Sequence, residues 1–131
     1  MVPWMNLVLL WAWPELSVKE CILKVQKLNG LLMTDFASIN NYEPQITHDH
    51  VVYLEKMIDK IEDKLHPTHE FLIPGESKGG ACLDLARTVA RRAERVMWDL
   101  AKNEVVPDED RIFLNRLSDF CFMLMRLEEN R

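Results

Sequence analysis

Apolar residues recur at helical spacing along most of the chain. Between about Glu15 and Ser38 they return every three or four residues, and Asn40 and Asn41 mark the end of the pattern. Such spacing places apolar side chains on one face of an α-helix. The apolar positions are Leu16, Cys21, Ile22, Val25, Leu28, Leu31 and Leu32. We predict a long amphipathic helix over this segment.

Three later segments show the same period. One begins at Thr47, a good N-cap residue, and stops before Pro67; the next runs from about Ser77 to Asn103, and the last starts near Asp108. The residues predicted to face inward are Leu54, Met57, Ile58, Ile61 and Leu65, then Leu83, Ala86, Val89, Ala90, Ala93, Met97 and Leu100, then Ile112, Leu117, Phe120, Met125 and Leu127.

The opening stretch Val2–Trp13 is strongly apolar and stops at Pro14. It is too short to span a bilayer, and it lacks the basic start and small-residue cleavage pattern of a signal peptide. We predict a buried helix over about Met5–Trp13, with no membrane association. Its tryptophans would lie in the core or at a subunit interface; they are Trp4, Trp11 and Trp13.

The fold class follows from these patterns. No stretch alternates apolar and polar residues, and three of the four glycines cluster in the irregular region around His66–Glu76 and just beyond it. The 131 residues suit one domain. We therefore predict an all-α, up-down helical bundle of about five helices in a single domain, residues 1–131.

Charge and cysteine content narrow the range of partners. The formal net charge of −5 argues against a nucleic-acid binder, so any anion site must be local. The three cysteines are odd in number and lie in apolar helical patterns, as small core residues do, so we expect no disulfide and a cytoplasmic location. They are Cys21, Cys82 and Cys121.

The most unusual feature is a row of arginines. Arg87, Arg91 and Arg95 follow one another at four-residue steps, where like charges repel by about 0.2–0.5 kcal/mol per pair. Asp84 and Glu94 share a narrow stripe of the helix with the first two and offset part of this repulsion. The row is either a solvated, salt-bridged face or a clamp for an oligophosphate. The charge pattern leaves both interpretations open.

Three sequence blocks discriminate between these interpretations better than the charge pattern does. They are Phe71-Leu-Ile-Pro-Gly, Ala86-Arg-Thr-Val-Ala-Arg-Arg-Ala-Glu-Arg95 and Phe113-Leu-Asn-Arg-Leu-Ser-Asp119. In this order they resemble the ATP:corrinoid adenosyltransferase family of the propanediol-utilisation type. The resemblance extends weakly through Val52–Lys64 and faintly to the N-terminal region. It implies a trimeric helical bundle that binds ATP, Mg²⁺ and cobalamin at subunit boundaries, where reduced cobalt attacks the 5′ carbon of ATP and triphosphate leaves.

The resemblance also implies roles for individual residues. Arg91 would neutralise the departing triphosphate, and Glu94 would hold that arginine or help position Mg²⁺–ATP. Arg87 matches an arginine that makes a contact across the subunit boundary. Asn115 matches an asparagine of the nucleotide site.

Two further residues concern the corrinoid side. Phe71 matches a phenylalanine that presses on the lower face of the corrin and displaces the axial ligand; without the resemblance it would be a core aromatic beside Leu72. Lys78 would meet a phosphate or a corrin side chain. Its loop is not a phosphate-binding P-loop, because the lysine precedes Gly79 and Gly80 and no strand leads into it.

The chain departs from the family at its start. The Thr-Gly-Asp-x-Gly-Thr-Thr segment that wraps ATP has no counterpart here, and Pro3 and Trp4 replace an aspartate and a glutamate. Asp84 stands where a histidine is common. We therefore expect this chain to bind corrinoid better than ATP and to turn over slowly or not at all.

Other interpretations remain open. The histidines lack the spacing of a zinc site, so we expect solvated side chains and no protein-bound metal; they are His48, His50, His66 and His69. Besides an adenosyltransferase, the chain is compatible with a non-catalytic corrinoid-binding or regulatory relative, or with a structural bundle. Separate titrations with cobalamin and Mg²⁺–ATP discriminate the three.

Overall fold

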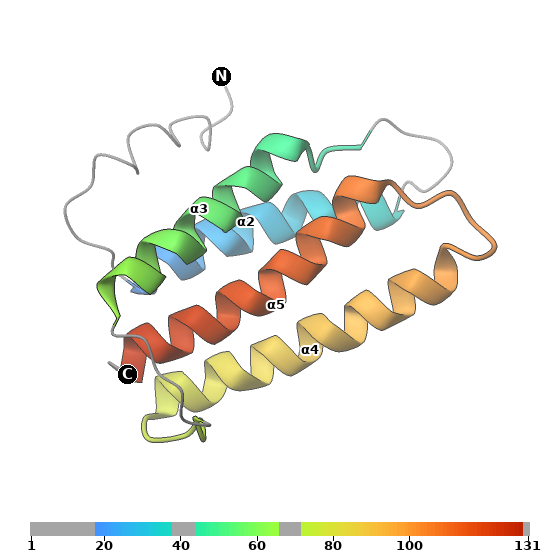
Figure 1. Ribbon diagram of the computed structural model, residues 1–131. Coiled ribbons are helices and arrows are strands. Elements are labelled where there is room, and N and C mark those ends of the chain that lie inside the picture. Colours follow the sequence, from blue (N-terminus) through green and yellow to red (C-terminus); the bar gives the residue numbers. More distant parts are fainter. Residues whose placement is uncertain (1–17, 38–43, 66–71, 130–131) are drawn as a thin grey trace.

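The structure is a computed structural model, and it describes residues 18–37, 44–65 and 72–129. These residues form helices and turns with no strand, as the apolar periodicity predicted. The helix predicted over Met5–Trp13 lies outside the described residues. The four helices are α2 (Val18–Ala37), α3 (His48–Lys64), α4 (Lys78–Leu100) and α5 (Asp108–Glu129), shown in Figure 1.

The helix starts lie where the capping residues predicted them. Ser77 precedes α4 and its hydroxyl accepts the backbone N–H of Gly80 at 2.9 Å. Thr47 precedes α3 and donates its backbone N–H to Nδ1 of His50 at 3.0 Å. His50 is therefore buried, and the prediction that it is solvated is wrong. Burial lowers the pKa of its imidazole, which suits the neutral, accepting nitrogen.

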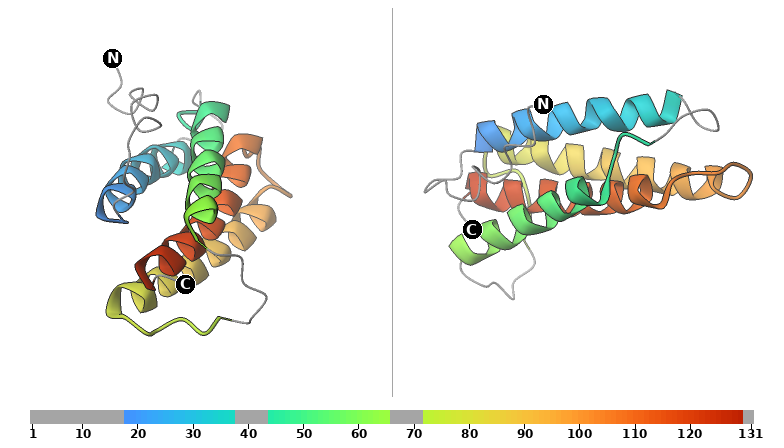
Figure 2. Two further views of the ribbon diagram at one scale, coloured as in Figure 1. Left: turned by 60° about the vertical axis from the view of Figure 1, so that its left-hand side comes forward. Right: turned by 90° about the horizontal axis from the view of Figure 1, so that it is seen from above.

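Helix α5 lies at the centre of the bundle. It packs between α3 and α4, as Figure 2 shows, and it also contacts α2. Phe113 and Phe120 of α5 are completely buried. Successive helices run in opposite directions, as in an up-down bundle, but α3 and α4 lie on either side of α5 (Figure 1). Helices α3 and α4 are consecutive in the described part of the chain but are separated by α5, so the order in space differs from the simple up-down prediction.

Helix α4 lies at the edge of the bundle. Leu83, Ala90 and Met97 are buried as predicted. Val89 is 47% exposed, and Ala86 is also exposed, so their predicted inward orientation is wrong. Because α5 is the main neighbour of α4, only a narrow arc of α4 is covered. Ile112 of α5 is likewise 43% exposed.

The cysteines divide into two kinds. Cys21 and Cys121 are buried, as predicted for small core residues, and burial raises the pKa of each thiol to about 11. Cys82 is exposed, so the core prediction is wrong for it. All three thiols are free in the structure.

Two buried aspartates join the helices at one end of the bundle. Asp35, near the end of α2, accepts the backbone N–H groups of Gln45 at 2.6 Å and Ile46 at 3.0 Å. Asp110, in the first turn of α5, is 1% exposed and hydrogen-bonds Asp35. Burial, this hydrogen bond and the Asp35 charge raise the pKa of Asp110 to about 8, so it holds a proton at neutral pH.

Candidate functional site

A polar stripe of α4 lines two cavities one after the other. Asp84, Arg87 and Arg91 line the first, and Glu94 lines the second. Since each helical residue advances about 100°, these four positions fall on one side of the helix. The stripe inferred from the sequence thus lies along the groove that α4 forms with α3 and α5. Arg91 of the first cavity and Glu94 of the second are one helical turn apart, so successive turns of α4 line the two cavities.

The first cavity, which we call the Arg91 cleft, has a volume of about 510 Å³. Helices α3, α4 and α5 and the segment before α4 contribute to its lining. Its apolar lining consists of Ile58, Leu72, Pro74, Phe122 and Met123. The rest of the lining is polar or charged and consists of Glu62, Asp84, Arg87, Arg91, Ser118 and Asp119. Arg91 is exposed, so it can meet an anion that enters the cleft from solvent.

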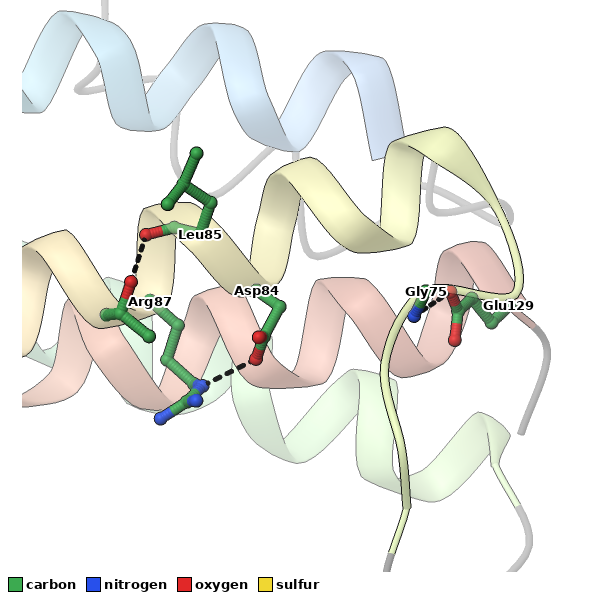
Figure 3. A network of polar contacts seen from close by, with 6 residues as sticks. Gly75, Asp84, Leu85, Arg87 and Glu129 are labelled. Carbon is green, nitrogen blue, oxygen red and sulfur yellow. Dashed lines mark hydrogen bonds and ion pairs between the residues drawn. The ribbon is translucent and has the colours of Figure 1, made fainter.

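Arg87 is held within its own helix. Its Nε donates to Oδ1 of Asp84 at 3.0 Å, one turn earlier, as Figure 3 shows. The two side chains are only 31% and 26% exposed. The carboxylate therefore offsets the Arg87 charge and fixes its direction. Arg91, by contrast, forms no ion pair within the described parts of the chain.

The second cavity, which we call the Trp98 pocket, has a volume of about 550 Å³. Glu94 and Trp98 come from α4, while Arg111 and Asn115 come from α5. The guanidinium carbon of Arg111 lies 4.7 Å from the centre of the Trp98 ring, a cation–π contact. Arg111 also forms an ion pair with Asp108. The pocket therefore offers an aromatic surface beside a fixed cation.

Two polar atoms of the Trp98 pocket are buried without a partner among the described residues. They are Oε2 of Glu94, an acceptor, and Nε of Arg111, a donor. Leaving such a group unsatisfied costs about 1–3 kcal/mol. The pocket therefore suits a polar ligand that presents both a donor and an acceptor.

The structure gives a distinct position to each predicted site residue that lies within its described ranges. Arg87 and Arg91 line the Arg91 cleft, and Glu94 and Asn115 line the Trp98 pocket. Lys78 is the exposed first residue of α4 and lines neither cavity. Phe71 lies outside the described residues, but its chain neighbour Leu72 lines the Arg91 cleft.

Sequence reasoning missed Trp98 and Arg111. A signal for Trp98 was present, because it lies one turn beyond Glu94 and continues the polar stripe of α4. Arg111 had no such signal, since it belongs to a different helix and only tertiary packing brings it to the tryptophan. A local sequence pattern therefore identifies one member of the pair but not the other.

Within the described ranges no three histidine, cysteine, aspartate or glutamate side chains gather closely enough to hold a metal ion. A metal that enters with a phosphate ligand needs fewer protein groups, because Mg²⁺ keeps waters and phosphate oxygens in its coordination shell. The unpartnered Oε2 of Glu94 fits such a single contact. None of the described helices combines the length and hydrophobicity that crossing a bilayer requires.

Comparison with known proteins gives a consistent family match. The cobalamin adenosyltransferase profile matches residues 5–128. A corrinoid adenosyltransferase of Citrobacter freundii is 34% identical over 115 residues, covering 88% of this chain and 64% of the relative. The Mycobacterium leprae corrinoid adenosyltransferase is 42% identical over 69% of the chain and 50% of the relative. The chain thus spans less than two thirds of the length of these relatives.

Solved structures agree in fold. A variant of the PduO-type ATP:corrinoid adenosyltransferase from Lactobacillus reuteri, complexed with cobalamin and ATP, superposes with a TM-score of 0.78 at 28% identity. The match covers 86% of this chain and 66% of that one. A second variant of the same enzyme, complexed with ATP, gives a TM-score of 0.77 over 83% of this chain and 63% of that one.

Proposed function

Because the chain belongs to the cobalamin adenosyltransferase family, we propose that it transfers the 5′-deoxyadenosyl group of ATP to the reduced cobalt of a corrinoid. The observation that carries this proposal is the pair of cavities lined by successive turns of α4. One presents Arg91 among apolar and charged side chains, and the other presents Glu94 and Asn115 beside an aromatic ring. A macrocycle and a nucleotide need two such neighbouring environments.

The reaction displaces triphosphate from carbon. The electron pair of Co(I) forms the cobalt–carbon bond at C5′, the C5′–O bond breaks, and its electrons leave with the triphosphate. Negative charge therefore accumulates on the departing oxygen. Arg91 would stabilise it as a permanent cation with several N–H donors, without transferring a proton. Phe71 would lie against the lower corrin face and keep that axial position free.

The nucleotide side would use the Trp98 pocket. Glu94 is one turn from Arg91, so its carboxylate can orient the guanidinium or contact Mg²⁺ that arrives with ATP. Asn115 has an amide for the nucleotide, and its oxygen already accepts from Arg116. The unpartnered Nε of Arg111 would donate to an acceptor on the adenosine part. Lys78, exposed at the start of α4, would meet a phosphate or a corrin side chain only from the rim.

We further propose a homotrimer, supported by an apolar stripe on the outer surface of α4. Leu85, Val89 and Val96 are 65%, 47% and 62% exposed, and their spacing places them within about 40° of one another around the helix. Arg92 lies between Val89 and Val96 on the same side, so the stripe is apolar with one charged position. Exposed apolar residues gathered on one face are typical of a subunit interface. Arg87 lies on the other side of α4 from this stripe, so the contact across a subunit boundary that the family resemblance implies for it would use a different face. The three free cysteines favour a reducing compartment such as the cytoplasm.

The test combines binding and chemistry on the same preparation. The protein is titrated separately with cob(II)alamin and Mg²⁺–ATP, and then mixed with chemically reduced cob(I)alamin and Mg²⁺–ATP without oxygen. We expect binding of both ligands and formation of adenosylcobalamin with one triphosphate per corrinoid. Binding of corrinoid without adenosylation would instead identify a carrier or regulatory protein, and binding of neither would leave a structural bundle.

A further inference from the structure

The C-terminal end of α5 contacts the segment that leads into α4. Oε2 of Glu129 accepts the backbone N–H groups of Gly75 at 3.2 Å and Ser77 at 3.1 Å. The hydroxyl of Ser77 also lies 3.5 Å from this oxygen. Figure 3 shows the Glu129 side chain directed from α5 toward Gly75. One carboxylate thus joins residues 52 and 54 positions apart in the chain.

The same carboxylate lies over the first turn of α4. A Cβ atom added to Gly80 would overlap Oε2 of Glu129, whereas one added to Gly79 would lie 2.8 Å from Oε1 of Glu128. Negative charge is favourable at a helix N-terminus, where backbone N–H groups point outward. The Glu129 carboxylate therefore occupies the position at the N-terminus of α4 where an anion would otherwise be attracted. The absence of side chains at the two glycines makes the close approach possible.

The contacted segment is a wall of the Arg91 cleft. Leu72 and Pro74 line that cleft, and Gly75 follows directly. Gly75 has a φ of 116°, a conformation that favours glycine, and bends lie on either side of it at Pro74 and Glu76. The segment contains no helix or strand, and tertiary contacts must therefore fix its course. Glu129 supplies two such contacts immediately after Pro74.

We propose that Glu129 is a positioning residue, which holds the segment 72–77 so that Leu72 and Pro74 form the corrinoid-facing wall of the Arg91 cleft. This rests on the proposed function, because it assigns the wall to the corrinoid. Glu129 touches neither substrate. It acts through the backbone of Gly75 and Ser77, and its loss should affect corrinoid binding while ATP binding is unchanged.

Two matched pairs of variants separate this role from a general effect of charge. Glu129→Ala removes the carboxylate that bonds Gly75 and Ser77, and Glu128→Ala removes its neighbour on the same turn. Gly80→Ala displaces the Glu129 carboxylate without changing the net charge, and Gly79→Ala is its control. Both glycines lie in the first turn of α4, where alanine is compatible with the helix, so these variants should fold. Glu129→Gln retains an acceptor oxygen, so it should lose less corrinoid affinity than Glu129→Ala does.

The first measurement is hydrogen exchange of the Gly75 and Ser77 amides in the ligand-free full chain. The second is the pair of dissociation constants for cob(II)alamin and Mg²⁺–ATP. We expect Glu129→Ala and Gly80→Ala to accelerate exchange of both amides and to weaken cob(II)alamin binding, each by about tenfold, as for loss of hydrogen bonds to a charged group. The Mg²⁺–ATP constant should not change. Both controls should resemble the wild type.

Unchanged exchange in Glu129→Ala would overturn the proposal, because the contact would then contribute nothing. Faster exchange with unchanged cob(II)alamin affinity would also overturn it, since the segment would be held without any consequence for the corrinoid. A wild-type chain that binds no corrinoid at all would contradict the proposed function as well. If the wild type binds cob(II)alamin normally and the Glu129 variants bind it equally well, only the positioning role is contradicted and the proposed function stands.

Discussion

Helices α4 and α5 have nearly the same length and opposite roles. Eleven of the 22 residues of α5 are buried, but only four of the 23 residues of α4 are. Helix α5 packs against all three other helices, so its side chains determine stability. Helix α4 packs mainly against α5, which leaves one side for the polar stripe and another for the exposed apolar stripe. A helix at the edge of a bundle can thus carry both chemistry and an interface because packing constrains so little of it.

Truncating a core aromatic of α5 should give the largest effect. Phe120 is completely buried, so Phe120→Ala should lower the free energy of unfolding by about 3–5 kcal/mol through lost burial and a cavity. Ile112→Ala, at a 43% exposed position of the same helix, should cost less than about 1 kcal/mol. Urea unfolding followed by circular dichroism measures both. Similar losses from the two variants would contradict the central position of α5.

Removing a charge from the polar stripe of α4 should affect function and not stability. Arg91→Ala should weaken Mg²⁺–ATP binding by about 1.5–3 kcal/mol, the usual contribution of a charge-assisted contact, while cobalamin binding changes little. Arg92→Ala is the control, since Arg92 lies about 100° away around the helix. Calorimetric titration gives both constants. Equal effects from the two substitutions would mean that the arginines act only through net charge.

The buried aspartate of α5 should make stability depend on pH. The pKa of Asp110 is about 8 in the folded state and near 3.8 when unfolded, so the folded state binds the proton more tightly. Its stabilising contribution is complete below about pH 4 and is lost as pH rises through 8. Asp110→Asn keeps a neutral side chain beside Asp35. At pH 9 the variant should be more stable than the wild type by about 1–2 kcal/mol, as expected for a shift of one unit or more.

The control for this pH dependence comes from α4. Asp99 is 77% exposed and forms an ion pair with Lys102 at 3.3 Å, a type of surface ion pair that contributes little. Thermal unfolding of Asp99→Asn between pH 5 and pH 9 should follow the wild-type curve. If the stability of the wild type instead rises between pH 5 and pH 9, and that of Asp110→Asn rises in parallel, then Asp110 is not protonated in the folded state.

The apolar stripe of α4 should give the smallest change in the stability of the subunit. Replacing Leu85 and Val89 together by aspartate should alter the free energy of unfolding of the monomer by only about 0.5 kcal/mol per site, because both are exposed. The same change should dissociate the proposed trimer. Thr88→Asp, exposed on the same helix but outside the stripe, should not. Sedimentation at several concentrations distinguishes a persistent trimer from a monomer.

Periodicity and capping residues predicted the helices well. The starts at Thr47, Ser77 and Asp108 are local signals, and the structure confirms them. The burial of individual positions was less predictable. Val89 fits the apolar period of α4 as well as Ala90 does, but α5 covers only one of them. Sequence spacing shows that a face is apolar, but it does not show whether a partner within the chain covers it.

The residues of the candidate site also differ in how well the sequence predicted their positions. The stripe from Asp84 to Glu94 lies on one helix, so its common direction was predictable from a 100° step. The Trp98–Arg111 contact and the Glu129 contact join helices through the tertiary fold, and no local pattern encodes them. The Asp35–Asp110 pair was equally hidden, because an aspartate in a first helical turn usually suggests a solvated N-terminal residue.

The central claim is that the groove along α4 brings C5′ of ATP to the reduced cobalt of a corrinoid. The most direct measurement uses ATP labelled with ¹³C at C5′, mixed with cob(I)alamin and the protein without oxygen and followed by NMR. The account predicts that the label appears as a cobalt-bound methylene carbon, with one triphosphate released, and that Arg91→Ala slows its appearance far more than Arg92→Ala. Label that stays in ATP, or is recovered in ADP with inorganic phosphate, would contradict the account.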